Sequence, residues 1–414
     1  MSVFDLPLPA VAELVASVRG PQPGIDETAD AFARVAWTVL IEPGDQVAGQ
    51  LIGALGSRRA LELVIAGDAA AAAEAWTQDG TEPRSAMQIA VEAFERWRLR
   101  LAVRPVVRAI EQAARLGLRV AVPADPGWPA GLSALGPAEP VALWVRGGLD
   151  RLAAFAGSVA VVGARAATGY GEHVAVELAG GLVDRGVAIV SGGAYGIDAA
   201  AHRSALASDG LTMAFLAGGL DRTYPAGNAD LLARVAQHGM LLAEVPPGVP
   251  PTRVRFLSRN RLLAASTAAT VVVEAGARSG SLNTAHHALS IGRPLGAVPG
   301  PVTSAMSAGC HRLLREEDVV CVTCADDVVE LVGGTGPAAP PAYRSVDPQV
   351  TRVLDELGTR RGRSTDEIAR SSGMSVGATL GVLGALEAEG AIRRIESGWV
   401  RSSARIGGAG EGRH

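Results

Sequence analysis

Apolar residues in the first third of the chain repeat with the spacing of amphipathic α-helices. Segments such as "AFARVAWTVL", "QVAGQLIGALG" and "AMQIAVEAFERWRLRLAVRPVVRAIEQAARLG" place apolar side chains three or four positions apart. Residues 25–119 are therefore predicted to form a helical domain of the SAM-like or helix-hairpin-helix-like kind. Plain helical packing is favoured for "PGDQVAGQLIGALGS", because its turn lacks the cations that a DNA-binding hairpin needs. Residues 1–24, rich in Pro and Ala, are predicted to be disordered.

The pattern changes at about residue 120, where short β-branched runs begin to alternate with helical stretches. Seven such runs are "SVAVVGA", "GVAIVSGG", "LTMAFLAGG", "GMLLAEV", "ATVVVEAG", "PLGAVPG" and "DVVCVTC". Continuous apolar strands separated by helices are typical of a parallel sheet covered on both faces. Residues 120–332 are thus predicted to form an α/β, Rossmann-like domain. Several strands end in glycine, at the edge where such sheets bind ligands.

The remaining chain predicts a linker, a small domain and a tail. Residues 333–345 are rich in Gly, Pro and Ala and are predicted to be a linker. Residues 346–402 read as three short helices and a hairpin, which is winged-helix-like, with Ser364 and Glu367 forming a capping box. Residues 403–414 are predicted to be a disordered tail.

Composition narrows the classes of protein that the chain can belong to. The formal charge of −4, from 38 basic and 42 acidic residues, argues against a generic nucleic-acid binder. No lysine occurs, so every basic side chain is an arginine, whose planar fork suits phosphate and base stacking. Three cysteines imply no disulfide framework. No apolar run is long enough to span a membrane and the N-terminus is not a convincing signal peptide, so a cytoplasmic location is expected.

The first strand-to-helix loop, "VVGARAATGYGEHVA", does not fit a dinucleotide-binding fingerprint. Arg165 stands where the G-x-G-x-x-G pattern requires its second glycine after Gly163, so NAD binding is disfavoured and no cofactor is expected. Arg165 and Thr168 before a helix N-terminus suit an anionic group. A surface arginine at a turn is an equally good interpretation of this loop alone.

The second loop, "SGGAYGIDAAAHR", carries three glycines between a strand and a helix. Gly192, Gly193 and Gly196 would let backbone N–H groups point into a concave anion-binding nest. Asp198 is interpreted as a cap of the following helix in preference to a catalytic acid. His202 lies one helical turn later and could pair with Asp198. Without a placed nucleophile, that pair is weak support for hydrolysis.

A basic tract lies inside this acidic protein. Between residues 245 and 315, Glu274 is the only acid, giving a local charge of about +7 against eight arginines, at positions 253, 255, 259, 261, 278, 293, 312 and 315. Arg259 and Arg261 flank Asn260 and are predicted to stand at the start of a helix, where anions are favoured. "GARSGSLNTA" is predicted to be another strand-to-helix turn, with Arg278 and neighbouring serines. Phosphate binding is preferred over a merely solvated charged face.

Two further motifs do not support a metal site or sequence-specific binding to duplex DNA. The cysteines of "CVTC" would point to opposite faces of a strand, and no second pair exists, so no metal site is predicted. The helix that would read a DNA groove, "SVGATLGVLGALEAEG", has two acids and no cation. Sequence-specific duplex binding needs cations at phosphates, so a protein-facing or regulatory winged helix is favoured.

Six motifs occur in the order found in the DNA-processing protein DprA (Smf) family. They are "DPGWPAGLSALGPAEPVALWVRGGL", "VAVVGARAATGYGEHVA", "IVSGGAYGIDAAAHRSAL", "LAGGLDRTYPAGNADL", "FLSRNRLLAASTAATVVVEAGARSGSLNTA" and "GRPLGAVPGPV". The chain resembles that family over about residues 123–331. The resemblance implies a Rossmann-like domain that binds single-stranded DNA and loads the recombinase RecA onto it in natural transformation. It also implies a protein without established catalysis, and a homodimer.

The resemblance assigns DNA contacts to motif positions of this chain. These are Gly163, Arg165, Ser191, Gly192, Gly193, Gly196, Arg255, Arg259, Asn260, Arg261, Arg278, Ser279, Gly280 and Ser281. No catalytic residue is assigned. The chain departs from the family pattern at Ala164, where serine is usual, at Leu211, where lysine is common, and at Ala217, in a segment that often carries cysteine.

Two other functions compete with this interpretation. A LOG-type nucleotide phosphoribohydrolase would need a glutamate after the turn that here reads "ARSGSLNTA", and none follows before Glu316. Without that acid, hydrolysis has no obvious general base. A transcriptional regulator acting through the winged helix is weakened by the absence of cations on the groove-reading helix.

Overall fold

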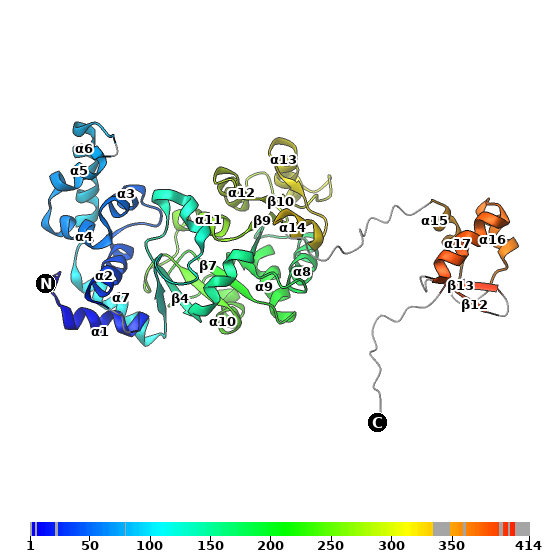
Figure 1. The fold of residues 1–414 in the computed structure, drawn as a ribbon, viewed down its shortest axis with the longest axis horizontal. Coiled ribbons are helices and arrows are strands. Elements are labelled where there is room, and N and C mark those ends of the chain that lie inside the picture. Colours follow the sequence, from blue (N-terminus) through cyan, green and yellow to red (C-terminus); the bar gives the residue numbers. More distant parts are fainter. Residues whose placement is uncertain are drawn as a thin grey trace, which may run out of the picture. The chain divides into compact units, whose positions relative to one another are not determined.

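The computed structural model describes residues 2–4, 6–20, 24–78, 80–333, 348–358, 362–388, 392–395 and 398–401. The chain divides into two compact units, residues 1–336 and 337–414, which are taken separately below. Figure 1 shows unit 1 as a helical region followed by a large sheet with helices on its faces.

The helical region of unit 1 begins earlier than the sequence predicts. After the short strands β1 (Ser2–Val3) and β2 (Leu6–Pro7), its helices are α1 (Leu8–Arg19), α2 (Ile25–Leu40), α3 (Gln46–Leu55), α4 (Ser57–Ala66), α5 (Ala69–Gln78), α6 (Pro83–Arg98) and α7 (Val103–Arg115). The prediction that residues 1–24 are disordered is wrong for α1. Val11, Val15 and Val18 share one face of this helix and are buried in the core, so burial orders a segment whose composition suggests a tail.

A nine-stranded sheet forms the centre of unit 1, in the order β11-β10-β9-β5-β6-β7-β8-β4-β3. The seven predicted runs all form strands and pair in parallel: β5 (Val159–Val162), β6 (Ile189–Ser191), β7 (Thr212–Leu216), β8 (Met240–Ala243), β9 (Ala269–Val272), β10 (Leu295–Ala297) and β11 (Val320–Cys321). Two further strands, β3 (Arg119–Ala121) and β4 (Leu143–Gly147), extend the β8 edge in antiparallel pairing. The sheet is therefore mixed at one edge.

Helices cover both faces of the parallel strands, as the apolar strand pattern predicts. One face packs against α8 (Gly169–Val183), α9 (Ile197–Ala207) and α14 (Ala325–Leu331). The other packs against α11 (Arg253–Ser266), α12 (Ser281–Ser290), α13 (Ala308–Glu316) and the 3₁₀ segments η1 (Ala130–Ala138) and η2 (Leu149–Gly157). The remaining elements of unit 1 are α10 (Ala229–His238), η3 (Ala226–Asn228) and η4 (Ala305–Ser307).

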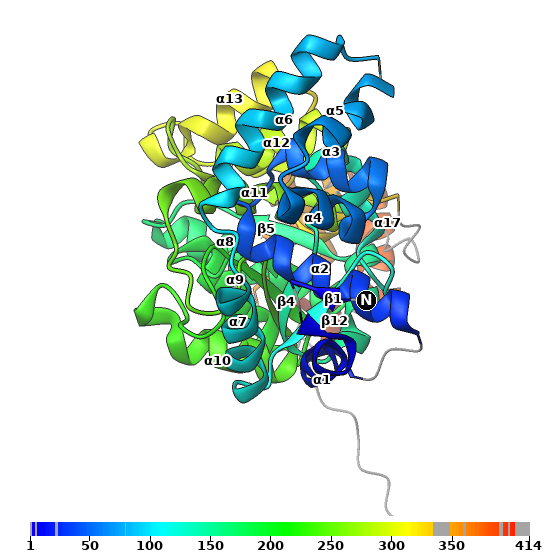
Figure 2. The same cartoon turned by 90° about the vertical axis from the view of Figure 1, so that its left-hand side faces the viewer.

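The helical region and the sheet share one hydrophobic core. The buried side chain of Trp144 on β4 joins this core, and its indole N–H donates to Thr38 Oγ1 at 3.3 Å. Figure 2 shows α1, α2 and α7 against the β4 side of the sheet. The predicted boundary near residue 119 thus falls inside a continuous packed body, because β3 and β4 are covered by the helices that precede them.

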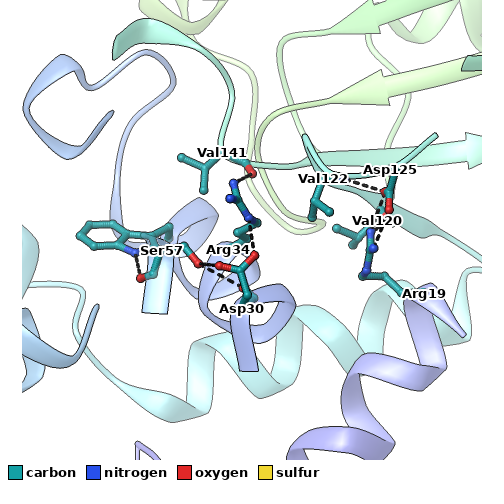
Figure 3. A network of polar contacts seen from close by, with 9 residues as sticks. Arg19, Asp30, Arg34, Ser57, Val120, Val122, Asp125 and Val141 are labelled. Atoms are coloured by element: carbon teal, nitrogen blue, oxygen red, sulfur yellow. Dashed lines mark hydrogen bonds and ion pairs between the residues drawn. The ribbon is translucent and has the colours of Figure 1, made fainter. Parts of the chain in front are cut away.

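Polar contacts fix this junction at two points (Figure 3). Arg19 donates to both carboxylate oxygens of Asp125 at 2.8 and 2.7 Å and to the Val120 carbonyl at 2.9 Å. Arg34 donates to Asp30 at 2.7 Å and to the Val141 carbonyl at 3.3 Å. Bidentate arginine contacts set orientation as well as attraction. The helical region is consequently oriented against the chain that leads into the sheet.

Unit 2 contains α15 (Pro348–Asp355), α16 (Thr365–Ser372), α17 (Val376–Ala388), β12 (Ile392–Ile395) and β13 (Gly398–Arg401). The predicted three helices and hairpin are confirmed. Ser364 caps α16 with Glu367, whose carboxylate accepts the Ser364 N–H at 2.8 Å. Apart from Gly333, the predicted linker 333–345 lies outside the described residues, as does the predicted tail 403–414.

Candidate functional site

A cavity of about 900 Å³ opens where the parallel strands of unit 1 end. Strand β5 lies between β6 and β9, and the chain builds the sheet outward in opposite directions from it. Such a reversal leaves a crevice at the carboxyl ends of the strands, because the two following loops turn away from each other. Loops 163–166 and 276–281 line the cavity, together with the first half of α11.

The structure brings together eight of the fourteen residues assigned to DNA. Those that line the cavity are Gly163, Arg165, Arg259, Asn260, Arg278, Ser279, Gly280 and Ser281. Those absent from its lining are Ser191, Gly192, Gly193, Gly196, Arg255 and Arg261. Of the glycine-loop segment that follows β6, Ala194 and Asp198 line the cavity, whereas its three glycines do not.

The N-terminus of α8 is occupied by a carboxylate of the protein itself. Thr168 caps this helix, and its N–H and hydroxyl donate to the two oxygens of Glu274 at 2.8 and 2.6 Å. Glu274 is buried, as expected for an acid that is fully hydrogen-bonded. The anion predicted at this helix start is therefore internal. Arg165, three positions before Thr168 in the same loop, is exposed.

The predicted nest in the glycine loop also holds an internal acid. Asp198 Oδ2 accepts the N–H groups of Gly192 and Ala194 at 3.1 and 3.3 Å. These bonds run back to the loop, so the interpretation of Asp198 as a helix cap is wrong. Burial raises the pKa of Asp198, although the charge of Arg259 and the two N–H groups oppose that shift. The N–H groups of Gly192 and Ala194 therefore bind an acid of the protein, where the sequence predicted that the loop would bind an external phosphate.

Two glycines in this loop need the conformations that glycine allows. Gly193 has φ +69° and Gly196 has φ +72°, both in the region that side chains disfavour. A Cβ on Gly193 would lie 2.9 Å from Leu232 Cδ2, inside the core. The carbonyls of Gly193 and Ala194 both accept from Asn228 Nδ2 at 3.0 Å. The loop is thus held by the core and by Asn228.

Arg259 and Arg261 lie in the middle of a helix, which corrects the prediction that they begin one. Helix α11 starts at Arg253, six residues before Arg259, because Thr252 caps it by accepting the Arg255 N–H at 3.3 Å. Arg259 is 6% exposed and donates to the carbonyls of Gly192, at 2.8 Å, and Phe215. Burial lowers the pKa of Arg259 to about 10, so it stays charged at neutral pH. It supplies positive potential to the cavity floor.

Arg261 and Arg255 form ion pairs with acids away from the cavity. Arg261 makes a bidentate contact with Glu244 at 2.8 and 2.6 Å, and its side chain is 6% exposed. Arg255 donates to both carboxylate oxygens of Glu42 on the helical region, at 2.9 Å each. The Arg261–Glu244 pair is buried and the Arg255–Glu42 pair is partly exposed. An incoming phosphate could bind either arginine only by breaking its existing ion pair. Both residues position α11.

His202 does not pair with Asp198. Its Nδ1 lies 2.7 Å from Thr212 Oγ1, and the ring is fully buried under the sheet. Burial lowers the pKa of His202 to about 3, with the charge of Arg259 acting in the same direction. The ring is therefore neutral at physiological pH. It has the contacts of a core residue.

The turn before α12 is built as the sequence predicts. Helix α12 begins at Ser281, and Arg278 in the preceding turn is exposed. Asn260 holds this turn by donating from Nδ2 to the Gly280 carbonyl and to Asn283 Oδ1, each at 3.3 Å. Ser279 and Ser281 hydroxyls lie 2.8 Å apart. The turn thus presents a cation and hydroxyls to the cavity.

An aromatic pair in the cavity wall was missed by the sequence interpretation. Phe256 and Tyr224 have ring centroids 5.7 Å apart, and both line the cavity. The Arg165 guanidinium carbon lies 4.6 Å from the centroid of Phe256, a cation–π distance. Phe256 precedes Arg259 by three residues on α11, so helical spacing could have placed it at the site. Aromatic faces beside arginines suit planar rings attached to phosphates.

The charge around the cavity is positive. Arg165, Arg253 and Arg278 line it and are exposed. Asp198 is the only acidic residue among the described residues of its lining, and it is buried. Cations at a concave low-dielectric surface raise the local concentration of anionic ligands. The cavity can therefore hold a phosphate and an attached ring at once.

Other candidate features in the described residues carry no comparable chemistry. Cys321 and Cys324 are exposed and Cys310 is buried, each as a free thiol. No group of three or more His, Cys, Asp and Glu side chains in the described ranges could hold a metal ion. None of the described helices combines the length and apolarity that crossing a membrane requires.

Comparisons with known proteins agree with this architecture. A family described as DNA recombination-mediator protein A matches residues 119–333, and the DprA winged helix domain matches residues 337–398. A DNA processing protein DprA of Mycobacterium tuberculosis is 51% identical over 308 residues, covering 70% of this chain and 78% of the relative. Protein Smf of Escherichia coli K12 is 38% identical over 271 residues, covering 63% and 72%.

A solved structure supports the same assignment. The crystal structure of DNA processing protein A from Streptococcus pneumoniae matches with a TM-score of 0.57 and 29% identity, covering 73% of this chain and 97% of that one. The chain therefore belongs to the DNA recombination-mediator protein A family, the family of the DNA processing protein DprA, also called Smf.

Proposed function

We propose that this protein binds single-stranded DNA in the cavity of unit 1 and does not cleave it. The observation that carries the proposal is the stacking of Arg165 on Phe256 inside a cavity whose other exposed charges are Arg253 and Arg278. A base can stack on an aromatic face only after it leaves a duplex, so this wall favours a single strand.

Salt dependence tests the proposal. We expect the logarithm of the affinity for an oligothymidylate to fall with the logarithm of salt concentration with a slope of about −2 or steeper, since each of three arginine–phosphate contacts adds about −0.7. Fluorescence anisotropy of a labelled strand measures this slope, with a blunt duplex of the same length as the control. A flat response, or tighter binding to the duplex, would refute the proposal.

The proposal of binding without cleavage rests on the contacts of Asp198, the acidic residue in the cavity lining. Asp198 is committed to two backbone N–H groups, and burial raises its pKa. The first turn of α12 places Asn283 and Thr284, not an acid, at the cavity. These positions support a holding role over that of a LOG-type hydrolase. Release of free base from AMP by the purified protein would contradict this assignment.

We further propose that the protein acts in the cytoplasm as a homodimer that delivers the bound strand to RecA during natural transformation or recombination. Membership of the family supports this role. One cavity covers few nucleotides, so two cavities would hold a strand more firmly than one. Light scattering with and without DNA is expected to give twice the monomer mass. A monomer in both conditions would contradict the dimer.

A further inference from the structure

A second cluster of arginines lies outside the cavity, where α6 meets α7. Between residues 96 and 110 the chain has five arginines, at positions 96, 98, 100, 104 and 108, and no acid. This stretch therefore carries about +5 in a protein whose formal charge is −4. We call Arg98, Arg100, Arg104 and Arg108 the arginine corner. All four are exposed.

The corner differs from an ordinary solvated helix face. Such faces usually alternate charges so that acids and bases three or four positions apart attract each other. Here Arg104 and Arg108 are four positions apart and repel. Glu95 and Glu111 lie three positions from Arg98 and Arg108, but among the described residues no carboxylate comes within ion-pair distance of Arg98, Arg104 or Arg108. The apolar face of α7 is satisfied, since Val106 and Ile110 are buried. A bound anion would relieve the repulsion between these two arginines.

Contacts connect the corner to the cavity. Glu42 accepts from Arg100 at 2.7 Å and from Arg255 on α11 at 2.9 Å, so the two guanidinium groups share one carboxylate. Burial would raise the pKa of Glu42, but the hydrogen bonds from Arg255 and Arg100 outweigh it and lower that pKa. Arg253 and Phe256, on either side of Arg255 in sequence, line the cavity.

A second contact joins α7 to the rim of the cavity. A Cβ on Gly248 would lie 3.5 Å from Gln112 Oε1, so the 246–252 loop passes beside α7. This loop ends at Pro251 and Thr252, which line the cavity. Arg108 and Arg104 precede Gln112 by one and two helical turns and share its face, at intervals of about 6 Å. The arginines thus continue from the rim along α7.

We propose that the arginine corner is a second binding surface for single-stranded nucleic acid, which takes the phosphates of nucleotides that leave the cavity past Arg253. The inference rests on the proposed function, because it assumes that a strand occupies the cavity. The guanidinium groups, exposed and unpaired except at Arg100, match a flexible row of phosphates. The helical region thereby contributes directly to binding, in addition to packing against the sheet.

Strand length separates the two surfaces experimentally. The full-length protein would be titrated by anisotropy with labelled oligothymidylates of about 5 and about 20 nucleotides, one confined to the cavity and one able to reach the corner. The test variant is Arg98→Gln/Arg104→Gln/Arg108→Gln, which keeps Arg100 and its contact with Glu42. The matched control is Arg59→Gln/Arg84→Gln/Arg203→Gln. It removes the same number of positive charges, from exposed arginines of α4, α6 and α9. Thermal melts confirm that both fold.

For the long strand, we expect the slope of log affinity against log salt concentration to be less negative by about 2 in the corner variant than in the parent. At 0.1 M salt the variant should bind this strand on the order of tenfold or more weakly than the parent does. Binding of the short strand should not change, and the control variant should bind both strands as the parent does. The proposed role of the arginine corner is refuted if the corner variant binds the long strand as tightly as the control variant does, while both variants still bind the short strand. Failure of the parent to bind either strand would refute the proposed function as well.

An acidic protein segment is the competing partner for such a surface. A polyglutamate peptide of about 20 residues would be added as a competitor to the complex with the long strand. Unlabelled oligothymidylate should displace the labelled strand far better than the peptide does. If polyglutamate displaced the labelled strand as well as unlabelled oligothymidylate does, and if the corner variant no longer responded to the peptide, the corner would be assigned to an acidic protein. That result would overturn the nucleic-acid inference.

Discussion

Replacing Asp198 by alanine is expected to destabilise unit 1 by about 3–5 kcal/mol. The carboxylate accepts the N–H groups of Gly192 and Ala194 in a buried place, and both donors would lose their acceptor. Arg259, also buried, would lose the negative charge that offsets its own. Urea unfolding followed by circular dichroism measures the loss. Binding of a labelled oligothymidylate should weaken in parallel, because the displaced loop forms part of the cavity floor.

Two further variants make this result interpretable. Asp184→Ala removes an exposed carboxylate at the end of α8 and should change stability by less than about 0.5 kcal/mol. Asp198→Asn keeps an oxygen for the N–H donors but loses the charge, so a smaller loss of about 1–3 kcal/mol is expected. A parent-like stability for Asp198→Ala would refute this structural role. If the protein released base from a nucleotide and a folded Asp198→Asn variant did not, Asp198 would be a catalytic acid.

Replacing Gly193 by valine is expected to abolish most strand binding, with affinity at least about tenfold weaker and stability about 2–5 kcal/mol lower. A β-branched residue is strongly disfavoured at the φ of +69° found here. Its Cβ would also lie 2.9 Å from Leu232 and 3.3 Å from Leu216, both in the core. Since Gly193 does not line the cavity, the effect acts through movement of the loop and of Arg259 behind it.

Gly186 provides the matched control for this substitution. It has φ +74° in the turn between α8 and β6, and no atom lies within 4 Å of a Cβ placed there. Gly186→Val therefore carries the same backbone strain without the collision, and about 1–2 kcal/mol of stability should be lost with binding intact. Equal loss of binding in both variants would mean that general instability, not the position of the glycine loop, weakens the DNA complex.

The fold could be predicted from the sequence where the pattern is local and strong. The seven β-branched runs form seven parallel strands, because a strand buried on both faces must be apolar throughout. Helix α1 and strands β3 and β4 were not predicted. Val11, Val15 and Val18 are too few to mark α1 within a Pro- and Ala-rich segment, and they become informative only where the core that they enter is known.

The sequence predicted which loops form the candidate site, but not which of the arginines near it are already paired with acids. The strand-end loops and the Arg278 turn follow from sequence, because glycines and the change from strand to helix are local signals. The partners of Arg255 and Arg261 could not be predicted, since Glu42 and Glu244 lie 213 and 17 positions away. Arg165 and Phe256 likewise meet only because the β5 loop and α11 converge on one cavity.

The sequence alone determined the seven parallel strands, most of the helices and the glycines and arginines available to a binding site, because these depend on side-chain periodicity and composition. Tertiary structure decided which of those charges remain free. Four acids of the protein bind groups that the sequence suggested were available to a ligand. Glu274 binds the start of α8 and Asp198 binds backbone N–H groups of the glycine loop. Two arginines of α11 are paired with Glu244 and Glu42. Pairing of charges depends on distances of a few ångströms between distant segments, and those distances are set by packing, which no local pattern records.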